Sequence, residues 1–145
     1  VAVPQLMEGS FAMLRYMLDT NICVYATSAR TFPVRTRLNR HAEQSCVSSV
    51  TYMELYYGAE YSSDPHRARR GLDEFAAPLT LLDYDRDAAA HTGEIRAHLR
   101  RKGTPIGPYD SMIAGHARSK GLALVTNNLA EFSRVPGLQC ENWID

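Results

Sequence analysis

Apolar residues are distributed along the chain in two alternating patterns. Short apolar runs without a helical period are expected to be β-strands, and longer segments with an apolar residue at every third or fourth position are expected to be helices. The strands cover residues 14–18, 46–48, 79–82, 122–126 and a segment near 138–143. The helices cover residues 34–41, 50–59, 65–77, 85–102 and 108–121. Buried strands separated by helices predict a short parallel, Rossmann-like sheet with helices on both faces, in a single three-layer α/β/α domain of the α/β class.

Several residues fit the predicted helix ends. Ser48 or Ser49 can cap the helix that follows the second strand, because a serine hydroxyl accepts a hydrogen bond from a free backbone N–H. Pro65 and Pro108 suit first helical turns, and Gly121 suits a helix end. The segment Asp19-Thr20-Asn21 is expected to stop the first strand, since these side chains bond to nearby backbone groups.

Length and composition are those of one folded domain. The chain has 145 residues, of which 45% are hydrophobic, and this suits one domain with a real core. Residues 1–12 follow neither pattern, so we expect a natural start at Met13, a loose or added tail before it, and a domain over 13–145. The chain has no apolar run of about 20 residues and no signal-peptide pattern, so the cytoplasm is the expected compartment and no membrane partner is expected.

Charge and motif content exclude several classes of function. Lys plus Arg and Asp plus Glu both number 16, so the chain is not a polycation that binds nucleic acid by bulk charge. Cys23, Cys46 and Cys140 form no CxxC pair and are expected to be small buried hydrophobes. The sequence contains no HExxH zinc motif, phosphate loop, GxGxxG segment or GxSxG elbow.

Four polar residues are expected at the edge of the sheet where its strands end. Asp19 follows the first strand, Glu54 is one turn into the helix after the second, Asp110 is in the first turn of the helix before the fourth, and Asn128 follows the fourth. Ligands of parallel sheets bind at this carboxyl edge. Each residue alone also has a structural interpretation, such as a turn former for Asp19 or a complement to the helix dipole for Asp110.

The joint arrangement favours a divalent cation. Two unit charges 4 Å apart repel by about 4 kcal/mol at an effective dielectric constant near 20, so converging carboxylates need a cation or a proton. Mg²⁺ suits such a site because it takes oxygen ligands, keeps several waters and needs only one or two direct carboxylates.

The same residues lie in motifs that resemble a known family. The motifs are residues 17–21 (MLDTN), 48–58 (SSVTYMELYYG), 108–114 (PYDSMIA), 124–128 (LVTNN) and 131–132 (EF). Together they resemble the PIN domain, specifically the VapC ribonuclease toxins of bacterial toxin–antitoxin pairs. The resemblance implies an endoribonuclease dependent on Mg²⁺ or Mn²⁺ that cuts structured RNA such as tRNA and inhibits translation. It also implies a homodimer, neutralisation in a complex with a VapB-type antitoxin, and contact with DNA only through that antitoxin.

The resemblance also assigns roles to single residues. Asp19 and Asp110 match the principal metal ligands, and Glu54 matches a direct or water-mediated ligand. The family often has Asp where this chain has Asn128, which favours one tightly held ion over two. Glu131, one helical turn further on, is expected to compensate in part.

Other segments are candidates for contacts with partners. For RNA, the candidates are two basic stripes, which comprise Arg96, Arg100, Arg101 and Lys102, and Arg35, Arg37 and Arg40. For the antitoxin, the candidates are Tyr56, Tyr57 and Met53, of which Met53 is expected to belong to the core. Two other functions stay open: a catalytically weak PIN-like module that binds protein or RNA, and a phosphatase-like or nucleotide-binding α/β protein, which the missing phosphate loop disfavours.

Overall fold

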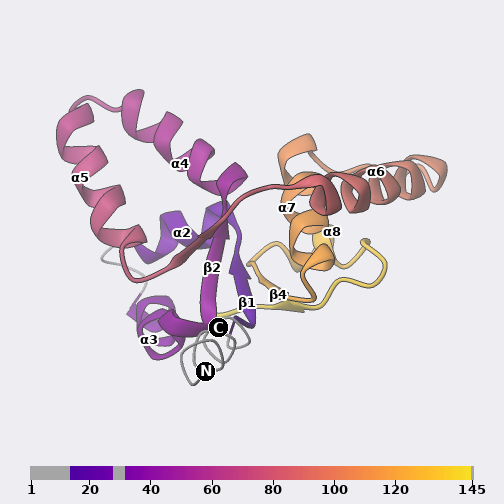
Figure 1. Cartoon of the computed structure of the whole chain (residues 1–145), viewed down its shortest axis with the longest axis horizontal. Helices are drawn as coiled ribbons and strands as arrows, with labels where there is room; N and C mark the ends of the chain where they lie inside the picture. Colours follow the sequence, from indigo (N-terminus) through magenta and orange to yellow (C-terminus); the bar gives the residue numbers. More distant parts are fainter. Residues whose placement is uncertain (1–13, 28–31, 145) are drawn as a thin grey trace, which may run out of the picture.

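The computed structural model describes residues 14–27 and 32–144, and the predicted tail over 1–12 lies outside them. Its centre is a five-stranded, all-parallel sheet with strand order β3-β2-β1-β4-β5 (Figure 1). The strands are β1 (Tyr16–Leu18), β2 (Ser45–Ser48), β3 (Thr80–Leu82), β4 (Ala123–Val125) and β5 (Cys140–Glu141). All five correspond to predicted strands, and the parallel α/β architecture is confirmed.

Helices connect the strands and cover both faces of the sheet. They are α2 (Thr20–Ala26), α3 (Phe32–His41), α4 (Ser49–Glu60), α5 (Pro65–Ala76), α6 (Arg86–Arg101), α7 (Pro108–Ser119) and α8 (Leu129–Phe132), with a 3₁₀ turn at Ala42–Gln44. Successive strand residues point to opposite faces. Met17 therefore packs in one hydrophobic cluster with residues of α6 and α7, and Leu18 in a second cluster with residues of α2 and α3. These two clusters confirm the three-layer arrangement.

The structure corrects three expectations about local structure. Helices α2 and α8 are not among the predicted helices, and they have only 7 and 4 residues, too few to show a clear period. Thr80 and Leu81 of β3 are exposed, because this strand is at the edge of the sheet. Cys140 is only half-buried for the same reason, on the opposite edge strand, whereas Cys23 and Cys46 are buried as expected.

Helices α6 and α7 pack closely and run in opposite directions. Ion pairs join Asp85 to Lys120 at 2.6 Å and Glu94 to Arg118 at 2.7 Å, so the start of α6 lies beside the end of α7. A Cβ on Gly115 would lie 2.2 Å from the Thr92 hydroxyl oxygen, so only glycine fits at this crossing. The end of α6 therefore lies near the start of α7, the turn that carries Asp110.

Candidate functional site

Asp19 begins the site at the carboxyl end of β1. It is the N-cap of α2, and its Oδ1 accepts a hydrogen bond from the Ile22 backbone N–H at 2.8 Å. The side chain is buried, with 3% of its surface exposed. Burial raises the pKa of the Asp19 carboxyl, and hydrogen bonds from Thr126 and Ile22 oppose that rise. The predicted strand end at Asp19 is thus also the start of a helix.

Glu54 comes to the same edge from α4. The helix starts directly after β2, where the Ser48 hydroxyl caps it by accepting a hydrogen bond from the Val50 N–H at 3.1 Å. The Thr20 hydroxyl, next to Asp19 in the chain, donates to Glu54 Oε1 at 2.7 Å. The negative charge of Glu54 also contributes to the raised pKa of Asp19. Glu54 and Asp19 therefore lie near one another where the neighbouring strands β2 and β1 end.

Asp110 lies in the first turn of α7, as the sequence predicts. The pKa of its carboxyl is raised to about 6, first by partial burial, then by a hydrogen bond with Glu131 and by the charges of Glu131, Glu54 and Asp19. These electrostatic effects place the four acidic side chains in one cluster. We call Asp19, Glu54, Asp110 and Glu131 the acid cluster.

Two hydrogen-bond donors hold the carboxylate of Glu131 in this cluster. Its Oε2 accepts a hydrogen bond from Asn128 Nδ2 at 2.9 Å, and its Oε1 lies 3.4 Å from the Gly107 backbone nitrogen, which donates to it. The Asn128 backbone N–H in turn donates to the Thr126 hydroxyl at 2.9 Å. Glu131 was expected only to compensate for Asn128, whereas its carboxylate contacts Asp110 directly. The spacing of three residues in the short helix α8 was the signal for it.

The donor set suits a hard divalent cation, although it is not a preformed cage. Across residues 14–27 and 32–144, no three His, Cys, Asp or Glu side chains are gathered tightly enough to enclose an ion. Burial is the main cause of the raised pKa values of Asp19 and Asp110, and the negative charges of acidic neighbours add to both. Mg²⁺ keeps several waters and needs only one or two direct carboxylates, so this looser arrangement is compatible with it.

A family model decides where the chain belongs. The model described as PIN domain matches residues 16–138, most of the chain. The chain belongs to the PIN domain family. It is 53% identical over 131 residues to the "tRNA(fMet)-specific endonuclease VapC" of Salmonella typhimurium, covering 90% of this chain and 99% of that protein. It is 51% identical over 132 residues to "Ribonuclease VapC2" of Haemophilus influenzae, covering 91% of this chain and 100% of that protein.

Solved structures agree with this PIN domain assignment. The fold matches a chain in the DNA-bound VapBC structure from Salmonella typhimurium with a TM-score of 0.86 and 53% identity, covering 90% of this chain and 98% of that one. It matches a chain of VapBC2 from Rickettsia felis, solved with a promoter DNA fragment, with a TM-score of 0.84 and 38% identity, covering 90% and 99%. The resemblance to PIN-domain VapC proteins is therefore confirmed.

A buried hydrogen bond joins α7 to the start of α4 in this PIN domain. His116 of α7 is fully buried, and its Nδ1 lies 2.8 Å from the hydroxyl oxygen of Ser48, the cap of α4. Its ring meets the Tyr84 ring edge-on, with centroids 5.6 Å apart. Burial lowers the pKa of His116, which keeps the imidazole neutral. The side chain therefore connects the helices that carry Glu54 and Asp110.

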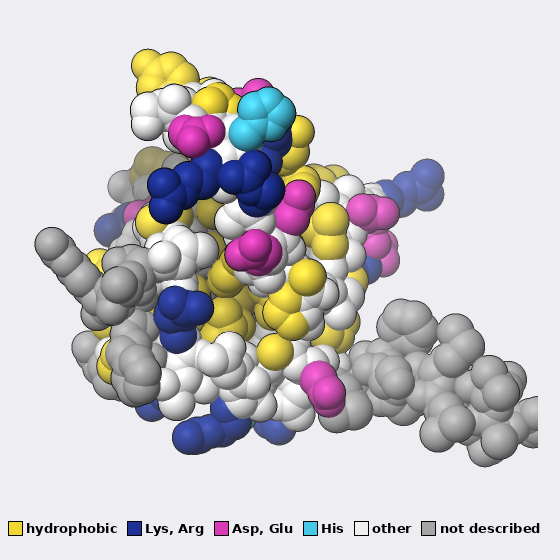
Figure 2. Space-filling model, turned by 90° about the vertical axis from the view of Figure 1, so that its left-hand side faces the viewer, with side chains coloured by type: hydrophobic (Ala, Val, Ile, Leu, Met, Phe, Trp, Pro, Cys, Tyr) yellow, Lys and Arg dark blue, Asp and Glu magenta, His cyan; other side chains and the backbone are white. Residues whose placement is uncertain are grey.

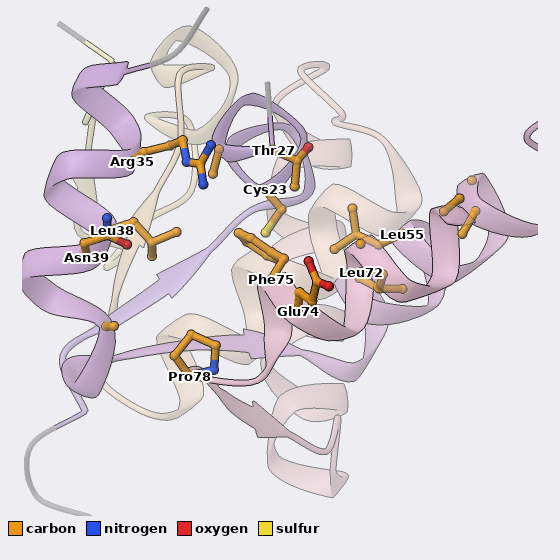
Figure 3. A pocket seen from close by; sticks show the side chains of 16 residues that line it. Cys23, Thr27, Arg35, Leu38, Asn39, Leu55, Leu72, Glu74, Phe75 and Pro78 are labelled. Carbon is orange, nitrogen blue, oxygen red and sulfur yellow. The ribbon is translucent and has the colours of Figure 1, made fainter. Parts of the chain in front are cut away.

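A separate apolar groove lies between helices α2, α3, α4 and α5. Its volume is about 540 Å³, and Cys23, Leu38, Leu55, Leu72 and Phe75 converge on it (Figure 3). Figure 2 shows apolar side chains at the centre of this face, with cationic side chains above and below them. None of the four residues of the acid cluster lines the groove.

Proposed function

We propose that this chain is a metal-dependent endoribonuclease that acts on tRNA, and that it is the toxin of a toxin–antitoxin pair. The observation that carries the proposal is the acid cluster, in which Glu131, Glu54 and Asp19 lie near enough to Asp110 for their charges to raise the pKa of its carboxyl. Relatives with half of their residues identical bear the names of tRNA(fMet)-specific endonuclease and ribonuclease. An initiator tRNA is therefore the substrate that we propose.

Mg²⁺, or Mn²⁺ in its place, is the proposed cofactor. Asp19 and Asp110 would hold the ion, and Glu54 would complete its shell directly or through water. The ion would supply charge stabilisation at the scissile phosphate and lower the pKa of its bound water. Thr20 and Asn128 would keep Glu54 and Glu131 oriented through the hydrogen bonds that they donate.

A VapB-type antitoxin is the proposed partner. Related structures are VapBC complexes bound to DNA, so we propose that this chain contacts DNA through its antitoxin. A basic antitoxin side chain near Asp19 and Asp110 would form charge-assisted hydrogen bonds in place of the metal. Tyr56, Tyr57 and Met53 of α4 are all exposed, so they are available for apolar contact, and the expectation that Met53 belongs to the core is wrong. Homodimer formation stays a prediction.

Cleavage of tRNA by the purified chain tests the proposal. Initiator tRNA, an elongator tRNA and an unstructured RNA would be incubated with Mg²⁺, with Mn²⁺ and with excess chelator. We expect cleavage of the initiator tRNA that requires the metal and stops on addition of the antitoxin. The matched control is Asp87→Asn, which removes an exposed acid of α6 outside the acid cluster and should retain activity. Binding of tRNA without cleavage under every metal condition would favour the alternative, a catalytically weak binding module.

A further inference from the structure

A second groove lies beside α6. Its volume is about 550 Å³, and it is bordered by α6, the loop before α7 and the first turn of α7. The residues that line it include Gly93, Arg96, Arg100, Pro105, Ile106 and Ser111. Arg96 and Arg100 belong to one of the two basic stripes that are candidates for RNA contact.

Arg96 and Arg100 form a pair of like charges on one side of α6. They are four residues apart on α6, so they project from the same side of the helix, where like charges disfavour helix formation. Neither side chain has a hydrogen bond or an ion pair with any residue in the described part of the chain. The helix's own Glu94 is already paired with Arg118 of α7. Two exposed guanidinium groups therefore lack a counter-charge in this groove.

Gly93 keeps the same groove open. It lies three residues before Arg96, in the interior of a 16-residue helix, where glycine is less stabilising than alanine. A Cβ built on Gly93 meets no atom within 4 Å, so the packing of the fold does not require a glycine. The missing side chain leaves space along the two arginines, as close approach of a ligand would require.

The groove ends next to the acid cluster. Ser111, at its border, directly follows Asp110 in α7. The loop of Pro105 and Ile106, which forms one wall, continues into Gly107, whose N–H donates to Glu131 of the cluster. An RNA strand with its scissile phosphate at the acid cluster would therefore have neighbouring phosphates within reach of the groove.

We propose that this groove, lined by Gly93, Arg96 and Arg100, binds backbone phosphates of the RNA substrate next to the cleaved bond. The inference rests on the proposed ribonuclease function and names the subsite that holds the strand. Arginine forks bind phosphate oxygens through paired hydrogen bonds, and four helical residues span about 6 Å, close to the spacing of successive phosphates. Because the chain has no net charge, such local cations are needed to hold RNA.

The other basic stripe does not compete for this role. It lies on α3, which ends at His41 just before β2 begins, at the edge of the sheet opposite the acid cluster. Arg37 of that stripe is engaged with the Asn142 carbonyl at 3.1 Å, and Arg35 borders the apolar groove. Of the two basic stripes, the one at the end of α6 is thus better placed to bind RNA near the acid cluster.

The test compares Arg96→Ala/Arg100→Ala with wild type in single-turnover cleavage of initiator tRNA over a series of salt concentrations. The matched control is Arg67→Ala/Arg70→Ala, which removes the same charge from exposed positions on α5. For the α6 pair, we expect the half-saturating protein concentration to rise at least tenfold. The cleavage rate at saturating protein should stay close to that of wild type. The slope of log affinity against log salt should fall by about 1.4, the value for two lost contacts to a single strand. The control should change neither quantity beyond twofold.

A second variant tests the space rather than the charge. Gly93→Leu should also raise the half-saturating concentration, without lowering the melting temperature, because its side chain would occupy the groove. Wild-type cleavage with equal affinities for the α6 and α5 pairs would overturn the phosphate subsite and leave the ribonuclease proposal intact. If the Arg96→Ala/Arg100→Ala variant changes only the oligomeric state or the binding of the antitoxin, the phosphate subsite would also be overturned. The groove would then be a protein interface. Absence of cleavage by wild type would instead refute the proposed function.

Discussion

The side-chain amide of Asn128 donates a hydrogen bond to the Glu131 carboxylate, with Nδ2 and Oε2 2.9 Å apart. An aspartate at this position could not donate to Glu131. The residue that departs from the aspartate common in the family therefore has a defined structural partner, and that partner contacts Asp110 in the acid cluster. The first prediction concerns this pair.

Asn128→Asp should destabilise the metal-free protein more than Asn128→Ala. The alanine variant loses only the donor to Glu131, at a cost of about 1–2 kcal/mol, whereas the aspartate variant also adds a repelling charge beside it. Urea unfolding in chelator measures both costs. Calorimetric titration with Mg²⁺ should then show one tightly bound ion for wild type and a second, weaker ion for Asn128→Asp. Equal stability of the two variants in chelator would contradict the supporting role of Asn128.

Asp19→Asn and Asp110→Asn should each abolish RNA cleavage while the fold is kept. Both changes preserve the shape of the side chain and remove a charge that the proposed cation would require. Cleavage of tRNA and circular dichroism on the same samples check the two halves of this prediction. Cleavage at the wild-type rate by either variant would show that the metal site is assigned to the wrong residues.

Without metal, Asp110→Asn should be more stable than wild type, by an amount that depends on pH. The pKa of Asp110 in the folded protein is raised from 3.8 to about 6, so ionisation of this group opposes folding. The penalty is absent below the unfolded-state pKa of 3.8, grows as the pH rises towards 6, and is constant above it. We expect wild type and variant to unfold at the same urea concentration near pH 4. Near pH 7 the variant should be more stable by about 1–2 kcal/mol after allowance for solvent screening.

Excess Mg²⁺ provides the internal control for that experiment. A bound cation removes the repulsion within the acid cluster in wild type, so the difference between the two proteins should shrink or reverse at pH 7. A difference that is the same at pH 4 and pH 7 would mean that it does not arise from ionisation of Asp110.

Sequence periodicity predicted the elements that are long enough to show a period. The five strands and the helices α3 to α7 follow from it, and the carboxyl-edge rule brought Asp19, Glu54 and Asp110 together. Helix α2 was not among the predicted helices, because an aspartate such as Asp19 is as typical of a strand end as of a helix N-cap. The role of Glu131 depends on the turn of α8 and on the Gly107 N–H, a contact across 24 residues that no local pattern contains. The link between Ser48 and His116, across 68 residues, is likewise invisible in the sequence.

The hydrogen bond between Ser48 and His116 should stabilise the fold. His116→Ala should cost about 2–4 kcal/mol, because it leaves a cavity in the core and removes the partner of the Ser48 hydroxyl. Ser48→Ala should cost about 1 kcal/mol through loss of the α4 cap. Since the two side chains contact each other, the double variant should be less destabilised than the sum by at least about 0.5 kcal/mol in urea unfolding.

The pH dependence of the same variants separates the hydrogen bond from simple packing. Burial lowers the pKa of His116 below its usual 6.5, as does Lys120, against the opposing charges of Asp85 and Asp83. The neutral imidazole therefore stabilises the fold above pH 6.5, and this contribution is lost as the pH falls through the folded-state pKa. The difference in unfolding free energy between wild type and His116→Ala should accordingly narrow below pH 6.5. The difference between Ser48→Ala and the double variant, which also measures the contribution of His116, should narrow over the same pH range. Because α4 carries Glu54 and α7 carries Asp110, both single variants should also slow cleavage at saturating Mg²⁺. Variants that lose stability but cleave tRNA at the wild-type rate would show that the link supports the fold without positioning the acid cluster.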